Sequence, residues 1–345
     1  MRANYYKHIL EFKRPSGTSR GVLKVKETWF IVIEHGHKRG IGECGILRGL
    51  SIDDTPEYEE KLKWACQNIH LGKEALYDAL REFPSIQFGV EQAFLSLHSQ
   101  NPFELFPSDF TQGKQSIPIN GLVWMGEKEF MKKQITEKIA LGFDCIKLKI
   151  GAIDFEEELD LLGYIRSQFS ADTIEIRVDA NGAFSPANAL QKLESLAKFD
   201  LHSIEQPIRQ GQFDEMRSLC QKTPLPIALD EELIGVFDLN QKSELITHIK
   251  PQYIIIKPSL VGGFKGTTDW LSVLDNRSIG WWITSALESN VGLNAITQFT
   301  YTLNSSMPQG LGTGALYTNN IESPLQVNQG AISYCPDLSW KTEYL

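Results

Sequence analysis

Cysteine is scarce in this sequence, and its few cysteines form no motif. The 345 residues contain five cysteines, an odd number spread from Cys44 to Cys335, with no Cys-x-x-Cys pair. A disulfide framework or a zinc site needs cysteines at short, paired spacings. We therefore predict reduced thiols that are mostly packed in the interior.

The sequence also lacks long apolar runs and an excess of basic residues. Its first fifteen residues contain no apolar core of a signal peptide, and no stretch approaches the ~20 apolar residues of a membrane span. Acidic residues outnumber basic ones by 43 to 34, and no Lys/Arg cluster is long enough to follow a phosphate backbone. These features predict a cytoplasmic protein that has neither a membrane nor nucleic acid as a partner.

What the chain does contain is a repeated pattern of short apolar or β-branched runs, each ending in a residue that could do chemistry. The successive end groups are 30, 26, 25 and 27 residues apart, the length of one strand, one helix and two loops. Parallel units of this kind close into a (β/α)8 barrel, whose active site lies at the carboxyl ends of its strands. The end groups are Lys149, Asp179, Glu205, Asp230 and Lys257.

The pattern predicts an α/β protein, a TIM barrel of (β/α)8 type with a weak last unit, (β/α)7β, and an additional domain. The chain exceeds a typical barrel of about 250 residues by roughly a hundred. Residues 1–115 lack the barrel period and read as an α+β capping domain, with antiparallel strands and a turn at residues 14–17. We expect the barrel at 116–319, with a first strand at 117–125 and a weak eighth at 310–313. The tail, 320–345, should pack back on the first domain.

Three carboxylates should converge at the mouth of this barrel. Asp179, Glu205 and Asp230 end three consecutive strands, which lie about 5 Å apart. Ionised carboxylates at such spacing repel one another unless a cation lies among them. Oxygen ligands suit a hard divalent ion, so we predict a Mg²⁺ site, with Mn²⁺ as a substitute.

Three lysines should surround the same site. Lys147 and Lys149 are two residues apart on one strand and so share its inward face, where each ammonium should lower the pKa of the other. Lys257 ends the strand on the opposite side of the ring. A cation that binds a substrate carboxylate, with a lysine beside the α-carbon, defines a reaction class: abstraction of an α-proton to give an enediolate. The predicted partner is therefore a small-molecule carboxylate.

At this point the residues resemble the muconate-lactonizing subgroup of the enolase superfamily over nearly the whole chain. The shared motifs are K-x-K at 147–149, D-A-N at 179–181, E-Q-P at 205–207, D-E at 230–231 and K-P at 257–258. Further runs, IKPSLVGG, TSALESNVGLNA and GLGTGALYTNN, are most similar to the members that serve menaquinone biosynthesis. The resemblance implies a Mg²⁺-assisted syn-dehydration of 2-succinyl-6-hydroxy-2,4-cyclohexadiene-1-carboxylate. It also implies that Lys149 moves the proton and that Lys257 stabilises the enediolate as a cation.

Further residues are predicted to contact the substrate. The resemblance gives Arg177 as a substrate contact, although pairing with the carboxylates is an equal alternative. Asn181 could hold metal-bound water or be an ordinary turn residue. Residues 14–20, which include Arg20, stand where related enzymes have a mobile lid, and a surface hairpin turn is the alternative. Ser285 and Gly312 are assigned from position alone.

Racemases and epimerases of the same superfamily are the nearest rival prediction. An N-acylamino-acid racemase or dipeptide epimerase resembles this chain at every metal and lysine position, but uses both lysines as acid and base. Dipeptide epimerases carry an Asp-x-Asp after the eighth strand, where this chain reads Gly310-Leu-Gly-Thr-Gly314. A muconate cycloisomerase is less favoured because the glutamate of that family is missing there. The residues leave open whether the protein forms a homo-oligomer.

Overall fold

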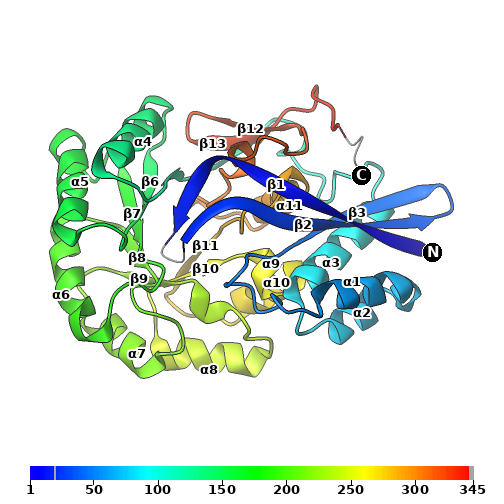
Figure 1. Cartoon of the computed structure of the whole chain (residues 1–345), viewed down its shortest axis with the longest axis horizontal. Coiled ribbons are helices and arrows are strands. Elements are labelled where there is room, and N and C mark those ends of the chain that lie inside the picture. The colour runs from blue at the N-terminus through cyan, green and yellow to red at the C-terminus, as the bar shows by residue number, and fades with distance from the viewer. Residues whose placement is uncertain (19–20, 342–345) are drawn as a thin grey trace.

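A computed structural model, which describes residues 1–18 and 21–341, places an antiparallel sheet with its helices beside a ring of parallel strands (Figure 1). The antiparallel sheet has the order β1-β2-β3. Helix α3 covers one face of it. The elements are β1 (Arg2–Thr18), β2 (Gly21–His35), β3 (Lys38–Gly45), α1 (Tyr58–Gln67), η1 (Ile69–Leu71), α2 (Lys73–Ala79) and α3 (Pro84–His98).

Successive side chains of β2 point to opposite faces of this sheet, and both faces are packed. Trp29, Ile31 and Ile33 are buried against the helices of the capping domain. Phe30 and Val32 point the other way, into a cluster that includes Ile321 from near the end of the chain. A period of two is the expected signature of a strand that buries both faces. The capping sheet is thus held between its own helices and later parts of the chain.

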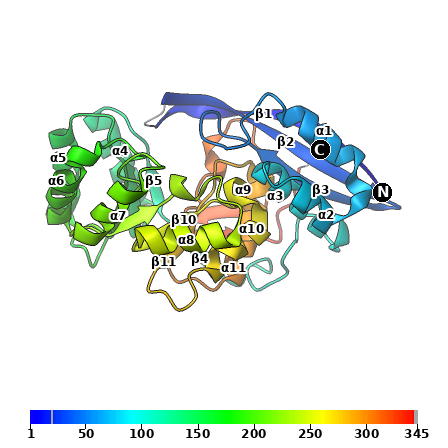
Figure 2. The same cartoon turned by 90° about the horizontal axis from the view of Figure 1, so that it is seen from below.

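The long β1–β2 hairpin differs from the sequence prediction. We predicted a turn at residues 14–17, but β1 continues to Thr18 and pairs with β2 up to Gly21, with a shift in register between Glu11 and Ser16. The irregularity absorbs the turn-like residues without ending the strand. The far end of the hairpin therefore reaches over the strands of the barrel (Figures 1 and 2).

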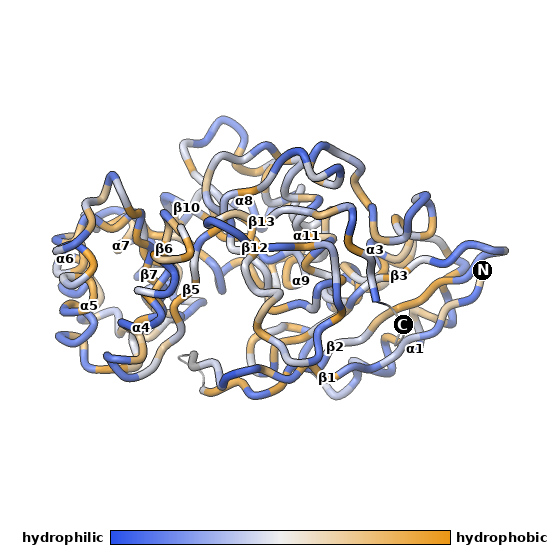
Figure 3. Tube along the Cα trace, turned by 90° about the horizontal axis from the view of Figure 1, so that it is seen from above, coloured by the Kyte–Doolittle hydropathy of each residue, from blue (hydrophilic) through white to orange (hydrophobic). Residues whose placement is uncertain are grey.

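The parallel sheet has the order β5 to β11 around the ring, as the repeated pattern predicts. Apolar residues on the helices face the strands, and hydrophilic residues face outward (Figure 3). The strands are β5 (Gly121–Val123), β6 (Cys145–Lys149), β7 (Glu175–Asp179), β8 (Ser203–Glu205), β9 (Ile227–Leu229), β10 (Tyr253–Ile256) and β11 (Gly280–Ile283). The helices are α4 (Lys128–Ala140), α5 (Phe155–Gln168), α6 (Pro186–Leu196), α7 (Phe213–Lys222), α8 (Leu239–Ile249), α9 (Pro258–Val261), α10 (Gly263–Ser272) and α11 (Asn290–Thr302).

The first and last strands of the ring also depart from the prediction. The run 117–125 is split: β4 (Ser116–Pro118) pairs with β13 (Ala331–Tyr334), and only β5 joins the barrel. The predicted eighth strand at 310–313 is replaced by two isolated parallel bridges, Ile119 with Gln309 and Thr284 with Gly310. These bridges bring the two ends of the parallel sheet together.

The end of the chain contacts both parts of the protein. β12 (Leu325–Asn328) and β13 form a small sheet with β4. Just before it, the Thr318 N–H donates to the Glu11 carbonyl at 2.9 Å, and farther on Trp340 stacks on Phe103 with ring centroids 4.1 Å apart. In the part of the chain that is described, no helix is long and apolar enough to cross a membrane.

Candidate active site

The strand register aligns the predicted catalytic residues in one layer at the mouth of the barrel. Lys149 is the direct partner of Asp179 between β6 and β7, and Asp179 is the partner of Glu205 between β7 and β8. Asp230 follows the last residue of β9 directly. Because the carboxyl ends of parallel strands meet at one edge, these side chains converge although they are far apart in sequence.

Each lysine of the site contacts a carboxylate. Lys147 donates to Glu205 and lies 2.9 Å from Asp179 Oδ2. The Lys149 Nζ is 2.5 Å from Asp179 Oδ2 and donates to Asn181 Oδ1 at 2.8 Å. Lys257, at the end of β10, donates to Asp230 at the end of the neighbouring strand β9. The three ammonium groups and three carboxylates therefore form one buried charge cluster.

The electrostatics of this cluster correct one prediction. Burial alone would lower the pKa of Lys147, but the carboxylates of Asp179 and Glu205 raise it. The expectation that the paired lysines would lower the pKa of Lys147 was wrong, since the carboxylates lie closer to its ammonium than the expectation allowed. Burial would also raise the pKa of Asp179, but the ammonium groups of Lys147 and Lys149 lower it.

Glu205 is the carboxylate of the cluster whose ionised form is least stabilised by its surroundings. Burial and the nearby Asp179 carboxylate raise the pKa of Glu205 well above its ordinary value. Its Oε1 atom is buried and accepts no hydrogen bond from any described residue, with the Lys257 Nζ 4.0 Å away. A buried carboxylate oxygen in this position favours a further cation.

The chemistry of the donor set therefore fits a hard divalent ion, although the side chains are not arranged as a finished metal site. As they lie, no group of three or more His, Cys, Asp or Glu side chains among the described residues could hold a metal. The reason is local: Lys147 and Lys257 occupy the space beside the carboxylate oxygens of Glu205 and Asp230. A bound cation would take the place of these ammonium groups beside the oxygens.

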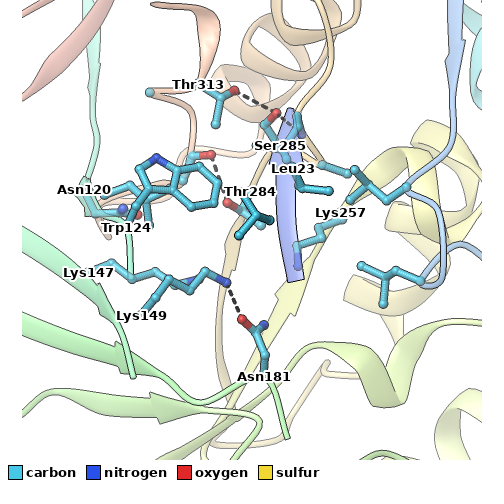
Figure 4. Close-up of a pocket in the computed structure, with 18 of the residues that line it drawn as sticks. Leu23, Asn120, Trp124, Lys147, Lys149, Asn181, Lys257, Thr284, Ser285 and Thr313 are labelled. Atoms are coloured by element: carbon cyan, nitrogen blue, oxygen red, sulfur yellow. Dashed lines mark hydrogen bonds between the residues drawn. The ribbon is translucent and has the colours of Figure 1, made fainter. Parts of the chain in front are cut away.

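A cavity opens directly above the lysines (Figure 4). Lys147, Lys149 and Lys257 line its floor, and Asn181 lies beside them. Its remaining wall is mainly apolar, so that one end of the cavity is cationic and the other suits a hydrocarbon surface. The apolar lining comes from Val22, Leu23, Leu47, Leu50, Leu122, Trp124, Ala286 and Leu287.

Three of the weaker predicted residues also line this cavity. Asn181 adopts a left-handed backbone conformation with φ of 43° and donates to Glu231 at 3.1 Å. Ser285 donates to Glu288 at 2.5 Å and accepts from Thr313 at 2.9 Å. Gly312 leaves space that a side chain would fill, since a Cβ atom there would lie 3.3 Å from Ile119 Cδ1.

Arg177 does not belong to this set. Its guanidinium donates to Glu175 at 2.6 Å and to the Pro308 carbonyl at 2.9 Å, and it lies 4.2 Å from the Trp282 ring centre. It is absent from the described residues that line the cavity, and its guanidinium is held by these partners instead. Arg20, the other predicted contact, lies outside the described residues.

Sequence reasoning missed most of the cavity wall. Residues of the hairpin and of the loop after β3, such as Leu23 and Leu47, line it from the capping domain. Asn120, Leu122 and Trp124 line it from the barrel. The only signal for the last three was their spacing of two, which puts them on one face of an extended segment.

Comparison with known proteins identifies the family. The family described as enolase C-terminal domain-like matches residues 131–337, which covers the barrel from its first helix onward. The chain belongs to the enolase superfamily. Members of this superfamily use a divalent metal, in agreement with the oxygen donors at the mouth of the barrel.

Within the superfamily, the chain is similar to o-succinylbenzoate synthases over nearly its full length. It is 48% identical to the o-succinylbenzoate synthase of Desulfotalea psychrophila, over 96% of this chain and 98% of that protein. The crystal structure of MenC from the same organism superimposes with a TM-score of 0.86 at 44% identity, covering 96% of this chain and 99% of the other. A muconate lactonizing enzyme from Pseudomonas fluorescens shares the fold, with a TM-score of 0.85 at 20% identity, covering 99% of this chain and 96% of that one.

Proposed function

We propose that this protein is a carbon–oxygen lyase that dehydrates 2-succinyl-6-hydroxy-2,4-cyclohexadiene-1-carboxylate to o-succinylbenzoate, a step of menaquinone biosynthesis. The observation that carries the proposal is the 48% identity, over nearly the full length of both chains, with a curated o-succinylbenzoate synthase. The cavity supports it, because a cationic floor suits the ring carboxylate and apolar walls suit the ring itself.

Lys149 is the residue that we assign to proton transfer. Its Nζ lies at the cavity floor, between Asp179 and Asn181. In its neutral form it takes the proton from the ring carbon that bears the carboxylate. It then returns that proton to the hydroxyl oxygen, so that water leaves from the same face of the ring. One group thus serves first as base and then as acid.

Lys257 and Lys147 have supporting roles in this proposal. Lys257 reaches the cavity from β10, on the other side of the ring of strands from Lys149. Its ammonium stabilises the negative charge of the enediolate that forms when the proton is removed. Lys147 lies below, against Asp179 and Glu205, and its positive charge favours the ionised form of both carboxylates.

Asp179, Glu205 and Asp230 are the residues that would hold Mg²⁺, with Mn²⁺ as a substitute. When bound, the ion supplies a Lewis acid that neutralises charge on the substrate carboxylate. The raised pKa of Glu205 and its unbonded Oε1 atom support this assignment. Asn181, which lies between Lys149 and Glu231, positions the ammonium of Lys149 beside this centre.

The positions of the two lysines are also compatible with a second candidate function, racemisation. Lys149 and Lys257 enter the cavity from different sides, as racemisation of an N-acylamino acid requires. The direct test is an assay of the purified protein with the cyclohexadiene carboxylate, in which we expect dehydration that EDTA abolishes and Mg²⁺ restores. Failure to dehydrate this substrate, together with rapid racemisation of N-acylamino acids, would instead favour the second candidate.

A further inference from the structure

Asn120 is a polar residue of the cavity to which the proposed reaction assigns no role. It stands between β4 and β5, and its backbone N–H donates to the Gln309 carbonyl at 2.9 Å, where the barrel closes. Its side chain is on the same face as Leu122 and Trp124 and lines the cavity with them (Figure 4). With an exposed fraction of only 6%, it is nearly as buried as the core.

The side chain of Asn120 has an unused acceptor. No described residue donates a hydrogen bond to its Oδ1 atom, which is buried. The other polar groups on this side of the cavity are paired: Thr284 Oγ1 donates to the Gly310 carbonyl at 2.9 Å, and Thr313 donates to Ser285. A buried amide oxygen costs free energy unless it is paired, so Asn120 points to a ligand that brings a donor.

The chemistry of the substrate identifies that donor, and this step rests on the proposed function. Two of the polar groups of the substrate are ionised carboxylates and a third is a ketone, and all of these only accept hydrogen bonds. The ring hydroxyl is the one group that donates. We propose that Asn120 Oδ1 accepts a hydrogen bond from the ring hydroxyl and so positions the group that leaves.

The placement of Asn120 agrees with the bonds that break and form. β5, which Asn120 precedes, is the neighbour of β6, with Leu122 paired to Lys147, so Asn120 lies deeper in the barrel than Lys149. Both side chains line the same cavity, Asn120 from its inner end. Lys149 takes the proton from the ring carbon, the C–O bond breaks, and Lys149 gives the proton to the departing oxygen. The product, water, still has a donor for Asn120, so the hydrogen bond persists through expulsion.

The product offers a sharp test because o-succinylbenzoate keeps both carboxylates and the ketone but lacks the hydroxyl. Asn120→Leu, which is close in size and has no acceptor, should lower kcat/KM for dehydration about tenfold or more, the effect of losing one ordinary hydrogen bond. The dissociation constant of o-succinylbenzoate, measured by calorimetry in the presence of Mg²⁺, should change less than about twofold.

Leu122→Ala is the matched control, because it alters the shape of the same wall without touching the acceptor and should weaken substrate and product in parallel. Asn120→Ala serves if the leucine variant does not fold. An Asn120 variant with unchanged kcat/KM, or with product affinity reduced by the same factor as kcat/KM, would overturn the inference. A wild-type protein that does not dehydrate the substrate would instead overturn the proposed function.

Discussion

Lys149 and Asp179 are direct partners in the register of β6 and β7, and the Lys149 Nζ lies 2.5 Å from Asp179 Oδ2. One carboxylate that we assign to the metal therefore also contacts the lysine that we assign to proton transfer. Base and metal site are built on neighbouring strands, so their separation is set by the sheet itself.

The role of Asp230 in holding the metal can be tested by binding alone. Asp230→Asn removes one negative charge and one ligand, and we expect Mg²⁺ or Mn²⁺ affinity to fall by about tenfold or more, since even outer partners of a ligand contribute tenfold. Titration calorimetry on metal-stripped protein measures this. Asp214→Asn, at an exposed position on α7, is the control and should bind metal as the wild type does. Unchanged affinity in Asp230→Asn would remove this residue from the ligand set.

Glu43 should join the capping domain to the barrel. It is fully buried on β3, and its carboxylate accepts from the Ser289 N–H at 2.8 Å and the Gly292 N–H at 2.7 Å, at the start of α11. Glu43→Ala leaves these donors unpaired and should lower the free energy of unfolding by about 3 kcal/mol. Urea denaturation measures the change, with the exposed Glu34→Ala as the control. Equal stability of the two variants would contradict this role.

The buried Lys242 should make the stability of the protein depend on pH. It is buried on α8, and burial lowers its pKa to about 8. Between that value and the ordinary pKa of lysine the unfolded chain binds the extra proton, so the contribution of Lys242 to stability rises with pH over this window and is a penalty below it. Lys242→Met should therefore be more stable than the wild type at pH 7, by up to about 3 kcal/mol.

The advantage of Lys242→Met should shrink when the same denaturation is repeated near pH 10. Lys222→Met, at an exposed position on α7, should show no such change. A gain for Lys242→Met that is the same at both pH values would show that the ammonium is not penalised in the folded state.

Lys257 should act through its charge. Lys257→Arg keeps a cation at the end of β10, whereas Lys257→Ala leaves the enediolate uncompensated. We expect the arginine variant to retain more dehydration activity than the alanine variant, as measured by kcat in steady-state assays. Equal loss in both variants would indicate that the lysine itself transfers a proton, as in a racemase.

The sequence was sufficient for the parts of the fold whose signals are local. The strands ending at Asp179 and Glu205 are short apolar runs closed by a charge, and such runs at a constant spacing predict a barrel without knowledge of contacts. The split of the first strand was not visible, because the segment changes partner along its length. β4 pairs with β13, Ile119 and Asn120 contact residue 309, and β5 pairs with β6, so that two of the three partners are distant in sequence.

Long-range contacts account for what could not be predicted at the site. The hydrogen bond between Glu43 and Ser289, at the start of α11, joins residues 246 apart in sequence. No pattern in either segment predicts that the two come together. Arg177 shares the inward face of β7 with Asp179, and the resemblance to the family predicted it as a substrate contact. Its guanidinium instead donates to Glu175 and to the Pro308 carbonyl, and the second contact, 131 residues away in sequence, could not be predicted from the spacing.

The central claim is that Lys149 alone carries the proton, and a paired measurement on Lys149→Ala tests it most directly. The dehydration rate and the exchange of the substrate α-proton in deuterium oxide should both be lost, while the dissociation constants of Mg²⁺ and o-succinylbenzoate stay within a few-fold of the wild-type values. Dehydration or exchange at a near wild-type rate in this variant would contradict the account.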